Sequence, residues 1–134
     1  VQGKLAIPFR TSYAAAKHAL HGFFESLRAE VAARDVKVTM VCPGYVKTNL
    51  SLNAVTGSGK IYSKMDENTA KGMEPAVLAK KILEAVAIGE HEVMACDFKT
   101  KAAIFARTLL PGPLASYMVS RAKKGWKDQR SSGK

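Results

Sequence analysis

Residues 36–44 read Val-Lys-Val-Thr-Met-Val-Cys-Pro-Gly, and this stretch decides the fold class. It is short, rich in β-branched side chains and closed by a Pro-Gly turn, which is typical of a strand buried in a parallel sheet. A long helical pattern precedes this strand and another helical pattern follows it. The alternation of helix and strand predicts an α/β fold.

The neighbouring segments extend this alternation in both directions. Residues 12–33 carry apolar side chains every three or four positions, which predicts a long helix with one apolar stripe: Ala16, Leu20, Phe23, Phe24, Leu27 and Val31. Pro75 favours the first turn of a second helix that ends at Gly89 and turns five side chains inward: Val77, Leu78, Ile82, Leu83 and Val86. Residues 92–96 predict a second strand. Amphipathic segments follow at residues 99–110 and 114–124, separated by a predicted break at Pro111-Gly112-Pro113.

Helix, strand, loop, helix, strand and helix is the order of a doubly wound parallel sheet. Two strands do not make a stable open sheet by themselves, so more strands are required. The sequence also begins at Val1 without a methionine or an apolar leader. We therefore expect residues 1–134 to be the C-terminal half of one Rossmann-like, doubly wound parallel-sheet domain whose cofactor-binding half lies upstream.

Composition excludes several classes of protein. The 134 residues are 47% apolar and 24% charged with two cysteines, which excludes disordered, collagen-like and disulfide-held chains. No apolar run reaches the ~18 residues that a membrane span requires. Cys42 and Cys96 are expected to be reduced, buried thiols. No metal is predicted, because His18, His21 and His91 lack the spacing of metal ligands.

The net charge of +10 is concentrated at the end of the chain. Residues 1–98 carry twelve Lys and Arg against ten Asp and Glu, whereas residues 99–134 carry nine against Asp128 alone. The basic tail, residues 121–134, holds six of these charges: Arg121, Lys123, Lys124, Lys127, Arg130 and Lys134. Such a tail is either a solvated end or an attractor of membranes or nucleic acid. Nucleic acid is not the expected partner, because Trp126 is the only aromatic residue among these charges.

The candidate chemistry lies in Ser12-Tyr13-Ala14-Ala15-Ala16-Lys17. Tyr13 and Lys17 are four residues apart, so on a helix they project from the same face, where an ammonium favours the ionised phenol. Such a pair is an acid/base unit if a ligand reaches it. The same spacing also occurs where an aromatic residue at a helix start stands near a solvated lysine. The three alanines between the pair keep the helix thin, so that a large planar ligand can approach its backbone.

Together with the next strand, this segment resembles the active-site helix of the short-chain dehydrogenases/reductases. Tyr13 and Lys17 match the catalytic pair of that family, whose next strand also ends in Pro-Gly and leads, four residues on, to a threonine. The corresponding run here is Pro43-Gly44-Tyr45-Val46-Lys47-Thr48. The resemblance covers nearly the whole chain. It implies an NAD(P)-dependent oxidoreductase that interconverts a carbonyl and an alcohol by hydride transfer.

The resemblance also implies a role for each matched residue. Tyr13 is expected to protonate the carbonyl oxygen as hydride arrives from the nicotinamide, and Lys17 to hold the nicotinamide ribose. The turn after the strand is expected to bind the cofactor through backbone groups that line the nicotinamide and a hydroxyl that reaches the carboxamide or a phosphate: Pro43, Gly44 and Val46, and Thr48. NADP(H) is expected in preference to NAD(H), although the residues that decide between them lie upstream.

Other motifs of that family are absent from the printed sequence. Its glycine-rich phosphate loop, its Asn-Asn-Ala-Gly turn and its catalytic serine all precede the tyrosine, and the serine is expected one position ahead of Val1. Ser12 adjoins Tyr13 and does not replace that serine. Gly57-Ser58-Gly59 lies in a loop and not between a strand and a helix, where a pyrophosphate is bound. We therefore expect residues 1–134 alone to be inactive.

Residues 45–73 are predicted to form a long loop, which the resemblance places at the substrate lid. Seven apolar side chains suit this loop to cover a lipid-like ketone: Tyr45, Leu50, Leu52, Val55, Ile61, Tyr62 and Met65. The resemblance further implies membrane association, at the endoplasmic reticulum or the peroxisome, through an anchor outside this sequence. Phe23 and Phe24, spaced with Leu20 and Leu27, fit either the core or the helix face through which this family often dimerises, so the resemblance leaves a homo-oligomer open.

Two other functions stay open from the sequence. One is an interaction module without catalysis that pairs through its long helix, and the other is a membrane-surface binder that uses the basic tail. Seven apolar side chains near the end of the chain fit either a membrane interface or the cap of a substrate pocket: Ile104, Phe105, Leu109, Leu110, Leu114, Met118 and Val119. Neither alternative function explains Tyr13, Lys17 and Thr48 together.

Overall fold

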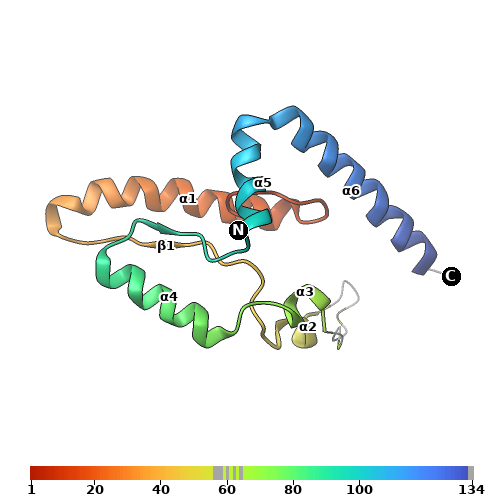
Figure 1. The fold of residues 1–134 in the computed structure, drawn as a ribbon, viewed down its shortest axis with the longest axis horizontal. Helices are drawn as coiled ribbons and strands as arrows, with labels where there is room; N and C mark the ends of the chain where they lie inside the picture. Colours follow the sequence, from red (N-terminus) through yellow and green to blue (C-terminus); the bar gives the residue numbers. More distant parts are fainter. Residues whose placement is uncertain (56–58, 60, 62, 64, 133–134) are drawn as a thin grey trace. The chain divides into compact units, whose positions relative to one another are not determined.

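The computed structural model describes residues 1–55, 59, 61, 63 and 65–132. Figure 1 follows the elements along the chain: α1 (Thr11–Val31), the 3-10 segment η1 (Ala32–Arg34), β1 (Met40–Val41), α2 (Leu50–Asn53), α3 (Glu67–Ala70), α4 (Pro75–Ile88), β2 (Glu92–Val93), α5 (Phe98–Leu109) and α6 (Pro111–Ser132). The chain divides into two compact units. The helical unit is Val1–Val36 with Asp97–Lys134, and the sheet unit is Lys37–Cys96.

The sheet unit is built on two parallel strands. Met40 of β1 pairs with Glu92 of β2, and Val41 with Val93. The pairing continues beyond the two strands, where the Gly44 N–H donates a 2.9 Å hydrogen bond to the Ala95 carbonyl. The predicted parallel α/β arrangement is confirmed, and it is that of part of a Rossmann-like domain.

Both strands are shorter than predicted. The register places residues 36–39 opposite residues 88–91, which close α4 and turn into β2, so this part of the predicted strand has no strand beside it. At the other end, the N–H groups of Cys42 and Gly44 still donate to the Val93 and Ala95 carbonyls, so the hydrogen-bonded pairing extends past Val41.

Helix α4 connects the two strands and has the predicted boundaries. Pro75 lies in its first turn, and Gly89 ends it in the left-handed conformation with φ at 70°. The predicted inward face is wrong in part. Ala85 is buried and two of the five predicted side chains are half-buried, while the other three are exposed: Val77, Leu83 and Val86. Two short strands offer too little surface to cover a wide apolar stripe.

The predicted long loop contains more structure than expected. Helices α2 and α3 lie within residues 45–73, and the carboxylate of Asp66 caps α3 by accepting a 2.9 Å hydrogen bond from the Thr69 N–H. The ends of this region are tied by a parallel bridge between Val46 and Met73. Four residues named in the sequence analysis lie outside the described residues: Gly57, Ser58, Tyr62 and Lys134.

Helix α1 has the predicted length, and its predicted apolar stripe is confirmed in part. Phe24, Leu27 and Val31 are half-buried, whereas the other three members of the stripe are exposed: Ala16, Leu20 and Phe23. A second face, which carries Ala14, His18 and His21, is also covered: Ala14 is 4% exposed, and the two histidines are half-buried. The N-terminal segment packs on this face so closely that a Cβ on Gly3 would lie 2.6 Å from the His21 ring.

The predicted break between the last two helices is present, but it lies at Leu110 and not at residues 111–113, because Pro111 already begins α6. A residue before proline is disfavoured in the helical region, whereas proline is tolerated in a first turn whose N–H groups are unpaired anyway. Helix α6 packs on α5 and on Phe9, whose ring centroid lies 6.5 Å from that of Trp126. Phe9 has a φ of 66°, a region that bulky residues rarely adopt.

The core of each unit is small. The buried apolar residues are Leu5 and Ala14 in the helical unit, and Cys42, Ala85 and Ala95 in the sheet unit. Cys42 and Cys96 are not joined in a disulfide; Cys42 is buried and Cys96 is half-buried. Within the described part of the chain, no large side chain is fully buried, and no helix is long and apolar enough to cross a bilayer. Little apolar burial is therefore available to offset the entropy of ordering the chain.

Candidate active site

Tyr13 and Lys17 lie one turn apart near the start of α1. The Lys17 Nζ lies 5.4 Å from the centroid of the Tyr13 ring, within the range of a cation–π contact. Tyr13 is 49% exposed, so a ligand has access to its phenol. The prediction that both side chains project from one face of a helix is confirmed.

The alanines between the pair leave the helix surface open. Ala14 is buried against the rest of the helical unit, while Ala15 and Ala16 are exposed. A methyl group is all that stands above the backbone at the two exposed positions. A flat ligand can thus approach this part of α1 closely.

A hydrogen-bonded cluster fixes the turn that follows Tyr13. The Nδ1 of His18 lies 2.8 Å from the Ala14 carbonyl oxygen, and its Nε2 lies 2.9 Å from Nη1 of Arg107. Because arginine only donates, His18 Nε2 accepts from Arg107, and Nδ1 donates to Ala14. Arg107 also donates to the Lys4 carbonyl at 2.7 Å. Sequence reasoning missed this cluster, since no local pattern links residues 89 positions apart.

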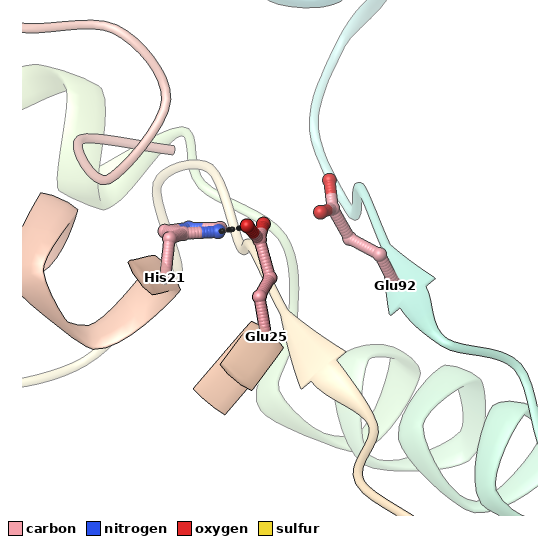
Figure 2. A group of neighbouring side chains, drawn as sticks. All are labelled: His21, Glu25 and Glu92. Atoms are coloured by element: carbon pink, nitrogen blue, oxygen red, sulfur yellow. Dashed lines mark ion pairs between the residues drawn. The ribbon is translucent and has the colours of Figure 1, made fainter. Parts of the chain in front are cut away.

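His21, one turn beyond His18, pairs with Glu25. Figure 2 shows the two side chains, with Nδ1 of His21 3.9 Å from Oε1 of Glu25. His21 and Glu25 are two ligands, fewer than a structural metal site needs. That His21 does not bind a metal stays a prediction.

The predicted cofactor turn lies in the sheet unit, directly after β1. Pro43 and Gly44 are half-buried, and a Cβ on Gly44 would lie 3.1 Å from the Cβ of Cys96. Such a contact is tighter than side chains normally tolerate, so a glycine lets the chain pass close to Cys96 here. The close contact with Cys96 therefore fixes the position at which the chain leaves β1.

Backbone pairing then holds the residues after the turn. The Lys47 N–H donates to the Met73 carbonyl at 2.9 Å, and the Met73 N–H donates to the Tyr45 carbonyl at 2.8 Å. Val46 lies half-buried between these bonds. Gly72 is essential to this approach, since a Cβ there would lie 2.7 Å from the Tyr45 carbonyl group. Sequence reasoning missed Gly72, which lies far from Tyr45 along the chain.

The last matched residue, Thr48, is exposed. Its Oγ1 accepts a long 3.5 Å hydrogen bond from the Leu50 N–H, so the hydroxyl keeps its proton available for a ligand. Beside it, Lys47 Nζ lies 2.8 Å from a Glu74 carboxylate oxygen. The hydrogen bond with Glu74, and the charge of that carboxylate, raise the pKa of Lys47 above its usual value.

The structure thus brings Tyr13 and Lys17 together in the helical unit. In the sheet unit, backbone hydrogen bonds hold the segment that contains residues 43–48. The helical unit also contains a cavity of about 200 Å³. Apolar side chains and one guanidinium line it: Leu5, Ala6, Arg107, Pro111, Leu114, Ala115 and Met118.

The sequence was compared with known proteins. The family profile described as short chain dehydrogenase matches residues 1–58, which include all six matched site positions. Dehydrogenase/reductase SDR family member 7B of Bos taurus is 47% identical over 131 residues, which cover 98% of this chain and 40% of that protein. Nearly the whole chain is thus similar to proteins of the short-chain dehydrogenase/reductase family.

Other members of the short-chain dehydrogenase/reductase family give the same result. Member 7B of Xenopus laevis is 50% identical over 124 residues, and the Drosophila melanogaster protein named Dehydrogenase/reductase SDR family protein 7-like is 49% identical over 124 residues. Each alignment covers 92% of this chain and 38% of the relative, so the chain spans about two fifths of their length. No solved structure matches the chain significantly.

Proposed function

We propose that this chain contributes the acid/base half of an NAD(P)(H)-dependent oxidoreductase that interconverts a carbonyl and an alcohol. The observation that carries the proposal is the Lys17 ammonium 5.4 Å from the ring of an exposed Tyr13. In this proposal Tyr13 gives its proton to a carbonyl oxygen and is left as a phenolate, while Lys17 holds the cofactor beside it from the same face of the helix. In the reverse reaction the same phenolate accepts the proton of the alcohol.

The chain also carries groups that fit a nicotinamide cofactor, which supplies the hydride when it is bound. Lys17 has donors for the ribose hydroxyls, and the exposed Thr48 hydroxyl suits a carboxamide or a phosphate. Pro43, Gly44 and Val46 line the nicotinamide in this proposal, and their fixed backbone supports it. NADP(H) is proposed in preference to NAD(H) on the family resemblance alone. Without a glycine-rich phosphate loop in residues 1–134, we propose that they are inactive by themselves.

The proposed substrate is a lipid-like ketone or alcohol. Its support is the apolar surface of residues 45–73, where five side chains are at least 39% exposed and available to cover an apolar ligand: Tyr45, Leu50, Val55, Ile61 and Met65. A location at the membrane of the endoplasmic reticulum or the peroxisome is proposed on resemblance alone.

The test is Tyr13→Phe in the complete polypeptide that carries this sequence. We expect kcat to fall by at least ~100-fold, because the ring remains and only the transferable proton is lost. Cofactor binding should stay nearly unchanged, whereas Lys17→Ala should damage both binding and turnover. Tyr117→Phe is the matched control, since Tyr117 is 60% exposed on α6. A Tyr13→Phe enzyme that keeps more than about a tenth of kcat would refute the assigned role.

An interaction module is the second candidate function. The exposed Leu20 and Phe23 on α1, 42% and 61% exposed, favour it because they form an apolar surface on which a second copy could pair. Subunit exchange with a tagged copy of the same polypeptide would detect such pairing. Loss of exchange in a Leu20→Ser/Phe23→Ser variant would support it, and unchanged exchange would reject it.

A further inference from the structure

Helix α5 turns its largest apolar side chains away from the rest of the helical unit. Phe98 is 84% exposed, Phe105 58% and Leu109 74%. Spacings of seven and four residues place the three on one face of a helix, and the exposed Ala102 lies between them. We name these four residues the α5 stripe. On the opposite side, Ala103 is half-buried, which shows which face α5 turns inward.

The structure separates the two interpretations of the apolar end of the chain. Leu114 and Met118 line the cavity of the helical unit, and Ile104 is half-buried. These residues suit a pocket. Phe105 and Leu109 are exposed instead and do not line the cavity. A different partner is therefore needed for the α5 stripe, whose three large side chains are more exposed than is usual for a helix face in a soluble domain.

Lysines flank the α5 stripe along the helix, and the acidic residue next to it is Asp97, which caps the start of α5. Lys99 and Lys101 lie on either side of the stripe around the helix axis. Residues 98–127 contain no Asp or Glu. On α6, the half-buried Met118 and Ala122 mark the inward side, and the opposite side carries exposed basic residues: Lys123, Lys124 and Lys127.

We propose that the α5 stripe docks on an anionic lipid surface. An apolar helix face flanked by lysines fits the boundary between acyl chains and negative headgroups, and the basic side chains of α6 add attraction at longer range. A second copy of this chain is a poorer partner for the stripe, because it would bring the same positive charges to the contact. This inference goes beyond the catalytic proposal and does not depend on it.

The test is flotation of the complete polypeptide that carries this sequence, prepared without any other membrane-binding segment, with phosphatidylcholine vesicles that contain about one third phosphatidylserine, at low and high salt. Phe105→Ser/Leu109→Ser should weaken partitioning by at least ~10-fold, because two apolar side chains no longer insert. Lys99→Gln/Lys101→Gln should weaken it by ~5-fold or more at low salt and have little effect at high salt. All replaced side chains except Lys101 are exposed, and circular dichroism of each variant checks that the helices persist.

Leu83→Ser/Ile88→Ser is the matched control. Leu83 and Ile88 lie on α4 and are 70% and 78% exposed, so the substitutions remove comparable apolar surface elsewhere. Partitioning of this control should equal that of the unchanged chain. The proposal would be overturned if the unchanged chain did not float, or if the α4 and α5 variants lost the same amount of vesicle partitioning. It would also be overturned if sedimentation showed that the α5 substitutions dissociate a dimer while flotation stays unchanged. None of these outcomes bears on the role of Tyr13 in turnover.

Discussion

Asp97 caps the helix that carries the α5 stripe, and replacing it should loosen the first turn of that helix. One carboxylate oxygen accepts a 2.9 Å hydrogen bond from the Thr100 N–H, and the other accepts a 2.7 Å bond from the Thr100 hydroxyl. Asp97→Ala removes both. Loss of such a cap costs about 1 kcal/mol, which corresponds to ~5-fold more opening of the turn.

The pH dependence of this cap has a definite sign. The hydrogen bonds from Thr100, first from its backbone and then from its hydroxyl, lower the pKa of Asp97 below its usual 3.8. A carboxyl whose pKa is lowered by folding stabilises the folded state above its unfolded pKa, and this contribution is lost as pH falls through the folded value. Asp97→Asn keeps an acceptor for the helix but does not titrate, so its helix start should not respond to acid in this range.

Amide hydrogen exchange at Thr100 is the measurement, corrected for intrinsic rates at each pH. The expected order of protection at neutral pH is the unchanged chain and Asp97→Asn together, and Asp97→Ala about fivefold lower. Asp35→Asn serves as a control, because Asp35 follows the η1 segment in the left-handed conformation that asparagine also adopts. If Asp97→Ala left protection of the Thr100 amide unchanged, the capping argument would be wrong.

Two further predictions concern the sheet unit and the chain as a whole. Gly72→Ala should displace the backbone at Tyr45, because the new Cβ would lie 2.7 Å from the Tyr45 carbonyl, and should therefore raise KM for the cofactor in the complete enzyme. Gly112→Ala is the control and should leave KM unchanged, because no atom lies within 4 Å of its new Cβ. Equal KM values for the two variants would contradict the predicted effect. Residues 1–134 alone should melt without a sharp transition and fail to bind NADPH at micromolar concentration; calorimetry and titration would disprove this by finding a cooperative melt and tight binding together.

Elements bounded by local chemistry were predictable from the sequence. Pro75 and Gly89 marked α4, the Pro-Gly turn marked the end of β1, and the Tyr13–Lys17 spacing predicted their shared face. The burial of the α1 face that carries His18 and His21 was not predictable, because it depends on the hydrogen bond from Arg107 to His18 and on close packing at Gly3. These contacts join residues that no local period connects.

The same limit applies to the turn after β1. The sequence motif located Gly44 and Thr48, whereas the need for Gly72 follows only from the close approach of two backbone segments. The start of α6 at Pro111, which was predicted at Leu114, was missed for a different reason. Proline and glycine together favour a turn, but the first turn of α6 accepts both Pro111 and Pro113. Local propensity thus allowed either a turn or the start of a helix at residues 111–113. The structure has the helix, and this helix packs on α5.

The backbone of Phe9 links the two ends of the helical unit in stability as well as in space. A positive φ on a bulky residue costs about 1–3 kcal/mol and persists only where the surroundings enforce it. Trp126 and the close approach of Gly125 to the Phe9 ring provide that enforcement. When the last turns of α6 fray, this conformation loses its support and the N-terminal segment relaxes with them. The segment around Phe9 and the part of α6 around Trp126 should therefore open together, as one cooperative substructure, although they are far apart along the chain.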